Sequence, residues 1–108
     1  MRRHERFEFD HQKALANARK HGVTFQAAGQ VLSDDEGERN HVEEYDDAHS
    51  LDEDRWITTG SHPQDRSVVL RIVWTERVDD SGALTRIIGA RPASRQERSI
   101  YEEEIRRR

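Results

Sequence analysis

The sequence predicts a single α+β domain over residues 1–108, with a mainly antiparallel sheet of about four to five strands. Three observations support this prediction. The chain opens with a short strand pattern followed by two helix patterns. Its second half contains consecutive β-branched segments joined by short turns, and it ends in a capped helix. A chain of 108 residues can build one modest hydrophobic core and no second one.

Alternation and helix caps mark the N-terminal elements. Residues 7–9 alternate apolar and polar side chains, which is typical of a strand. Asp10 is a candidate N-cap for a helix that runs to about Lys20 and that Gly22 can close. Thr24 can cap a second short helix. Residues spaced by three and four give this second helix one apolar face, made of Phe25, Ala28, Val31 and Leu32.

The second half of the chain has the composition of strands followed by a helix. The segments 55–60, 67–77 and 85–90 are predicted strands, separated by turn residues at 61–63 and 79–82. Ser94 and Glu97 can form a capping box, in which each side chain binds the backbone N–H of the other. This box predicts a last helix that continues through Ile100, Tyr101 and Ile105.

Charge is segregated along the chain. The net charge is -4, but the window 34–54 carries 11 of the 22 acidic residues and one of the 18 basic residues. This window therefore has a charge of -10, and the remainder of the chain has +6. We interpret the window as an acidic loop, either solvated or facing a basic partner, beside a basic body that suits phosphate.

Composition excludes several classes of site. The chain has no cysteine, which excludes disulfides, thiolate nucleophiles and cysteine-ligated metals. The six histidines show no HExxH or similar spacing, so we predict no metal and no cofactor. The charged start leads into no apolar segment, and no stretch is long enough to span a bilayer, so we expect a cytoplasmic protein without a membrane partner.

Two patterns resemble BrnT-type toxins of type II toxin-antitoxin systems, and together they cover most of the chain outside the acidic window. The first half reads Phe7-x-x-Asp10-x-x-Lys13-Ala14-x-x-Asn17-x-x-Lys20-His21-Gly22-Val23-Thr24-Phe25-x-x-Ala28. The second half reads Thr75-Glu76-Arg77 and then Arg86-Ile87-Ile88-Gly89-Ala90-Arg91-x-Ala93-x-x-Glu97-Arg98-x-x-Tyr101. The departures from the family's pattern are Leu32, where an aromatic residue is expected, Gly89, where serine is usual, Trp74 and Pro92.

The resemblance implies a RelE-like fold and an endoribonuclease that cleaves RNA and arrests translation. It also implies neutralisation by a BrnA-type ribbon-helix-helix antitoxin, through which the complex would bind operator DNA. Surfaces of the acidic window and of the closing helix are the expected antitoxin contacts. A non-catalytic or degenerate toxin fold that serves only as corepressor with its antitoxin is the alternative.

RNA cleavage without a metal requires cations that stabilise the phosphorane, and the predicted strands carry them. Four arginines lie on or beside the two most apolar strands, namely Arg71, Arg77, Arg86 and Arg91. Strict alternation places Arg71 and Arg77 on one face of the sheet, but Arg86 and Arg91 on opposite faces unless a bulge intervenes. We favour Arg77 and Arg91, because strand ends commonly form the rim of a cleft. A solvated arginine face is the alternative for each.

Other side chains offer acid-base chemistry or further RNA contacts. Glu76 is the candidate general base, His21 a base or acid, and Tyr101 a proton donor or stacking group, although packing of the Tyr101 ring into the core is the better interpretation. Glu76 could instead only pair with an arginine, and His21 could only cap its helix. The remaining candidates for RNA binding are Lys13, Lys20 and Arg95, together with Arg71 and Arg86. Trp56 and Trp74 could stack on bases, but core packing is the favoured interpretation.

Overall fold

The computed structural model describes residues 4–108, except for the side chain of Glu38. The first three residues of the charged start lie outside the described residues. The elements follow one another as β1 (Phe7–Glu8), α1 (His11–His21), α2 (Phe25–Leu32), α3 (Gly37–Asn40), β2 (His41–Tyr45), a 3-10 turn η1 (Asp47–His49), β3 (Trp56–His62), β4 (Asp65–Asp79), β5 (Gly82–Pro92) and α4 (Arg95–Arg106).

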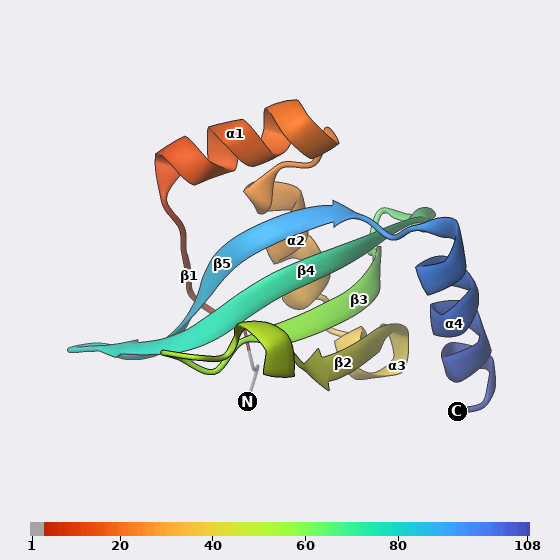
Figure 1. Cartoon of the computed structure of the whole chain (residues 1–108). Coiled ribbons are helices and arrows are strands. Elements are labelled where there is room, and N and C mark those ends of the chain that lie inside the picture. Colours follow the sequence, from red (N-terminus) through yellow and green to blue (C-terminus); the bar gives the residue numbers. More distant parts are fainter. Residues whose placement is uncertain (1–3) are drawn as a thin grey trace.

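The five strands form one sheet in the order β1-β5-β4-β3-β2. β1 pairs with β5 in parallel, and the other three pairs are antiparallel. Figure 1 shows α2 behind the sheet, α1 along β5 and α4 at the end where β5 terminates. The predicted α+β fold with an N-terminal strand, two helices, a mainly antiparallel sheet and a C-terminal helix is therefore confirmed.

The acidic window is more ordered than the sequence predicts, and its description as a loop needs correction. It contains α3, the edge strand β2 and η1. Charged residues are tolerated in β2 because it is the outermost strand and pairs only with β3. Besides its backbone pairing with β3, two side-chain contacts hold it: the Thr58 hydroxyl donates to Glu43 at 3.2 Å, and the Tyr45 ring packs edge-on against Trp56 at 5.2 Å.

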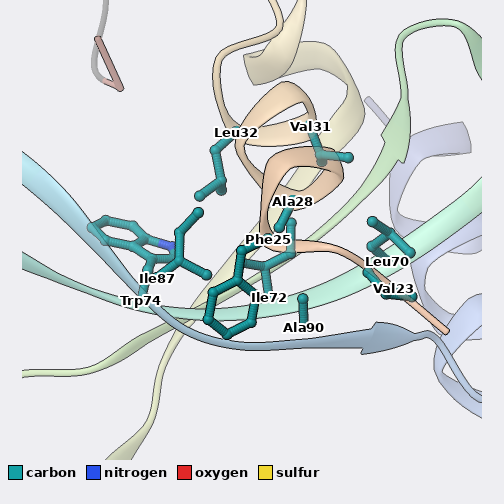
Figure 2. Close-up of a cluster of buried hydrophobic side chains, with 10 residues drawn as sticks. All are labelled: Val23, Phe25, Ala28, Val31, Leu32, Leu70, Ile72, Trp74, Ile87 and Ala90. Carbon is teal, nitrogen blue, oxygen red and sulfur yellow. The ribbon is translucent and has the colours of Figure 1, made fainter. Parts of the chain in front are cut away.

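The core lies between α2 and the sheet. Figure 2 shows Phe25, Ala28, Val31 and Leu32 of α2 facing side chains of β4 and β5. On the sheet side the cluster is completed by Leu70, Ile72, Trp74, Ile87 and Ala90, with Val23 from the loop before α2. Most of this apolar surface is removed from water, which is the main favourable term of folding.

One side chain of helix α1 forms hydrogen bonds with the edge of β5. The Asn17 amide donates to the carbonyl oxygens of Ala90 at 2.7 Å and Val23 at 3.0 Å, and its oxygen accepts the Ala90 N–H at 3.2 Å. Asn17 thus replaces a strand neighbour at this part of β5. The caps of α1 are as predicted, with Asp10 accepting from the Lys13 N–H and Gly22 in the left-handed region at φ 70.

A β-bulge interrupts the pairing of β4 with β5. Val73 lies opposite Gly89, whereas the next residue, Trp74, lies opposite Ile87. Ile88 is therefore an extra residue on β5. As a result Ile87 and Ala90, three residues apart, both face the core. A glycine inside a strand often marks a bulge, so Gly89 was a signal in the sequence for this irregularity.

Among the described residues no helix has the length and apolar character needed to cross a membrane.

Candidate functional site

The bulge brings four arginines to one face of the sheet. Arg91 lies directly opposite Arg71, and Arg86 lies opposite Thr75. Opposed residues of an antiparallel pair point to the same face, and Arg71, Thr75 and Arg77 share a face by alternation. We call this side, opposite α2, the arginine face. An ideal sheet would have separated Arg86 from Arg91, so the sequence alone could not establish this grouping.

At one end of the arginine face, two arginines share a carboxylate from α4. Glu97 accepts two bonds from the Arg91 guanidinium, at 2.6 and 2.8 Å, and its Oε2 lies 3.2 Å from Arg71 Nε. Arg71 also pairs with Glu44 of β2 at 2.9 Å. The hydrogen bond from Arg91 lowers the pKa of Glu97 to about 2, with a further contribution from the Ser94 N–H and against the opposing effect of burial. Glu97 is therefore ionised at neutral pH and orients both guanidiniums.

The other end of the arginine face has more cations than carboxylates. Arg86 pairs with Glu8 at 2.9 Å, and Arg77 pairs with Glu53 at 3.2 Å. Arg55, which directly precedes β3, lies 3.7 Å from the same Glu53 carboxylate. Three guanidiniums therefore face two carboxylates here. A shallow depression beside them is lined by Arg6, Phe7, Glu8, Arg77, Val78, Asp79 and Leu84.

The favoured pair Arg77 and Arg91 does not meet at one phosphate. Arg91 lies opposite Arg71, and Arg77 is six residues further along β4, about 20 Å at the rise of a strand. Glu76 is exposed, lies opposite Thr85 and points to the face that carries Trp74. The structure therefore separates Glu76 from the four arginines.

His21 and Tyr101 belong to the end of the fold near Arg91. His21 is half-buried as the last residue of α1, one helical turn after Asn17, which hydrogen-bonds to Ala90, the neighbour of Arg91. The Tyr101 ring is buried, and its hydroxyl donates to the Asn40 carbonyl at 2.7 Å. Tyr101 thus packs α4 against the start of β2, as the favoured interpretation of the sequence expects.

The remaining sequence candidates are dispersed. Lys13 and Lys20 are exposed on α1, two turns apart, and Arg95 is exposed at the first position of α4. Trp74 is buried in the core and donates its indole N–H to Thr58 at 2.8 Å, so it packs rather than stacks on a base. Trp56 stacks on Trp74 at 6.3 Å and is half-buried.

Sequence reasoning did not assign site roles to Glu97 and Arg55. Glu97 was assigned only to the capping box, which it does form with Ser94. Its contacts with Arg71 and Arg91 depend on the tertiary position of α4. No local signal distinguishes Arg55 from other charged residues around the acidic window. Among the residues that the structure describes, no group of three or more His, Asp and Glu side chains could hold a metal ion.

Comparison with protein families agrees with the resemblance in the sequence. Residues 9–97 match the family described as the ribonuclease toxin BrnT of type II toxin-antitoxin systems. A comparison with curated proteins found no match. The family match spans α1, α2 and the strands β2 to β5, including all four arginines of the arginine face. The chain therefore belongs to the BrnT family of ribonuclease toxins of type II toxin-antitoxin systems.

Proposed function

We propose that this toxin is a metal-independent endoribonuclease that inhibits translation and cleaves RNA on the arginine face. The observation that carries the proposal is the bulge at Ile88, which places Arg71 and Arg91 side by side on a rigid sheet. Guanidinium forks held in fixed positions suit the oxygens of a phosphate in which charge develops during cleavage. The bidentate contact with Glu97 holds the Arg91 fork in place.

The acid-base step is assigned to His21 rather than to Glu76. Cleavage requires removal of the 2'-hydroxyl proton and delivery of a proton to the leaving 5'-oxygen, and an imidazole can perform either transfer. Asn17 of α1 bonds to Ala90, the neighbour of Arg91, and His21 follows one helical turn later, whereas Glu76 points to the face that carries Trp74. Glu97 is a poor base, because its pKa of about 2 keeps the carboxylate unprotonated and bound to arginine.

A BrnA-type ribbon-helix-helix antitoxin is the proposed neutralising partner, and operator DNA would be bound only through it. Membership of a type II toxin family supports an antitoxin partner. Neutralisation would follow if the antitoxin covered the arginine face, because the same surface would then be closed to RNA.

The proposal is tested with the purified chain, a single-stranded RNA and EDTA. Arg91→Ala and Arg71→Ala should each reduce cleavage by about 10²-fold, the effect of removing one group that stabilises the transition state. Arg106→Ala is the matched control, because Arg106 is an exposed arginine of α4 that pairs with Glu103 of the same helix. Adding the antitoxin should abolish cleavage by the wild type. Equal rates for Arg91→Ala and Arg106→Ala, with both variants folded, would contradict the proposal.

The second candidate is a degenerate toxin fold that acts only as corepressor with its antitoxin. The charge balance around the two arginines favours it, since Arg71 and Arg91 already face two carboxylates of the chain, Glu97 and Glu44. Gly89 and Pro92, two departures from the family's pattern, flank Arg91. A corepressor would leave RNA intact in every variant while still binding antitoxin and operator DNA.

A further inference from the structure

Arg55 has an unusual environment for a guanidinium. Its Nε is buried and is the single buried side-chain nitrogen or oxygen atom within the described part of the chain that has no hydrogen-bond partner. The nearest anionic oxygen to its Nη2 is Glu53 Oε1 at 3.7 Å, which is too long for a hydrogen bond. A buried donor without a partner is rare in folded proteins and calls for an explanation.

The Glu53 carboxylate lies between two guanidiniums. Oε1 faces Arg55 Nη2 at 3.7 Å, and Oε2 accepts from Arg77 Nη2 at 3.2 Å. A phosphodiester resembles this carboxylate, because it also presents two anionic oxygens on one central atom. Each oxygen could face a different guanidinium. A phosphodiester carries the same single negative charge as a carboxylate. Its tetrahedral centre offers oxygens at a wider spacing, which suits the long Arg55 contact.

The backbone of both cationic residues is fixed to neighbouring segments. The Arg55 N–H donates to Ser50 Oγ at 2.9 Å, and its carbonyl accepts from Asp46 N–H at 2.9 Å. The Thr75 hydroxyl, from the middle of β4, donates to the Asp54 carbonyl at 2.6 Å and fixes the segment against the sheet. Arg77 belongs to β4 itself. Glu53 lies in the same irregular stretch as Arg55, two residues before it, and its carboxylate is partly exposed to solvent.

We propose that Arg55 and Arg77 form a binding site for a backbone phosphodiester of RNA, and that Glu53 occupies this site when RNA is absent. The inference rests on the proposed function, because RNA is the ligand. The site is separate from the Arg71 and Arg91 end, since Arg77 is about 20 Å along β4 from Arg71. It would hold a phosphate of the substrate away from the bond that is cleaved. Binding of RNA there would displace Glu53 and let the Arg55 guanidinium turn toward phosphate oxygens.

The test measures binding of a fluorescent 2'-O-methyl RNA oligonucleotide, which cannot be cleaved because it lacks the attacking hydroxyl. Fluorescence anisotropy is recorded in EDTA over a range of salt concentrations. Glu53→Gln should tighten binding about two- to fivefold, because RNA no longer competes with the carboxylate. Asp52→Asn is the matched control: it removes one charge from the same exposed stretch and should change the Kd far less.

Removal of a cation should have the opposite effect. Arg55→Gln should weaken binding about tenfold and reduce the slope of log Kd against log salt by about 0.7, the value of one phosphate contact on a single strand. Far-UV circular dichroism and the Tm establish that this variant is folded. In the wild type, the NMR signal of the Arg55 Nε–H should shift when the RNA is added.

The outcomes separate this inference from the proposed function. Equal effects of Glu53→Gln and Asp52→Asn, or an unchanged Kd in folded Arg55→Gln, overturn the phosphodiester site even if the wild type cleaves RNA. A wild type that binds the oligonucleotide with the expected variant effects but cleaves no unmodified RNA supports the site and contradicts the nuclease. A wild type that does not bind the oligonucleotide overturns the site.

Discussion

Arg71 and Arg91 lie directly opposite each other on β4 and β5, and the carboxylate of Glu97 contacts both guanidiniums. The two arginines belong to the sheet, and Glu97 belongs to the first turn of α4. One acidic side chain therefore caps a helix, attaches that helix to the sheet and contacts two cations. Changes at Glu97 should thus affect the stability of the fold as well as its chemistry.

Glu97→Gln should destabilise the protein by about 1 to 2 kcal/mol at pH 7, because the amide loses the negative charge and keeps only one oxygen that can accept from Arg91. The pKa of Glu97 is lowered from 4.5 to about 2 in the folded chain, so its contribution is complete above about pH 4.5 and is lost as the pH falls toward 2. Urea unfolding from pH 7 to pH 3 checks this expectation. The difference between wild type and variant should shrink below pH 4.5, and a difference that stays constant would contradict it.

Asn17→Ala should destabilise the edge of β5. The substitution leaves the Ala90 N–H and the Ala90 and Val23 carbonyl groups without their partner, at a cost of about 1 to 3 kcal/mol. Hydrogen exchange of the Ala90 amide should become faster, and the Tm should fall. Gln12→Ala, on the exposed side of α1, is the control and should change the free energy of unfolding by less than about 0.5 kcal/mol. Unchanged protection of the Ala90 amide in Asn17→Ala would show that the Asn17 hydrogen bonds do not stabilise β5.

Tyr101→Phe separates packing from proton transfer. The ring stays in place, but the hydroxyl bond to the Asn40 carbonyl is lost, which should cost about 0.5 to 1.5 kcal/mol. RNA cleavage at a temperature well below the Tm should remain within twofold of wild type. A large loss of cleavage in a variant with wild-type Tm would instead assign proton transfer to Tyr101.

The helices were predictable because their signals are local. Asp10, Gly22 and Ser94 mark helix ends by side-chain and backbone chemistry within a few residues, and the structure places the caps there. The strand β2 was missed because its charged sequence lacks an apolar alternation, and its pairing with β3 is a tertiary contact. The same distinction applies to the site. Strand arginines are visible in the sequence, but the bulge at Ile88 decides which face Arg86 and Arg91 share, and the fold decides that Glu97 and Glu53 reach them.

The assignment of acid-base chemistry can be tested by two substitutions with opposite expectations. His21→Ala should slow RNA cleavage by about 10²-fold or more, because the proposed proton transfer is lost. Glu76→Gln should change the rate by less than twofold, because this exposed carboxylate points away from the arginine face. Initial rates of both variants in EDTA, with unfolding measured alongside, give the comparison. If Glu76→Gln abolishes cleavage while His21→Ala does not, the reacting phosphate cannot lie at the Arg71 and Arg91 end, and the chemistry must belong to the region of Arg77 and the turn that joins β4 to β5.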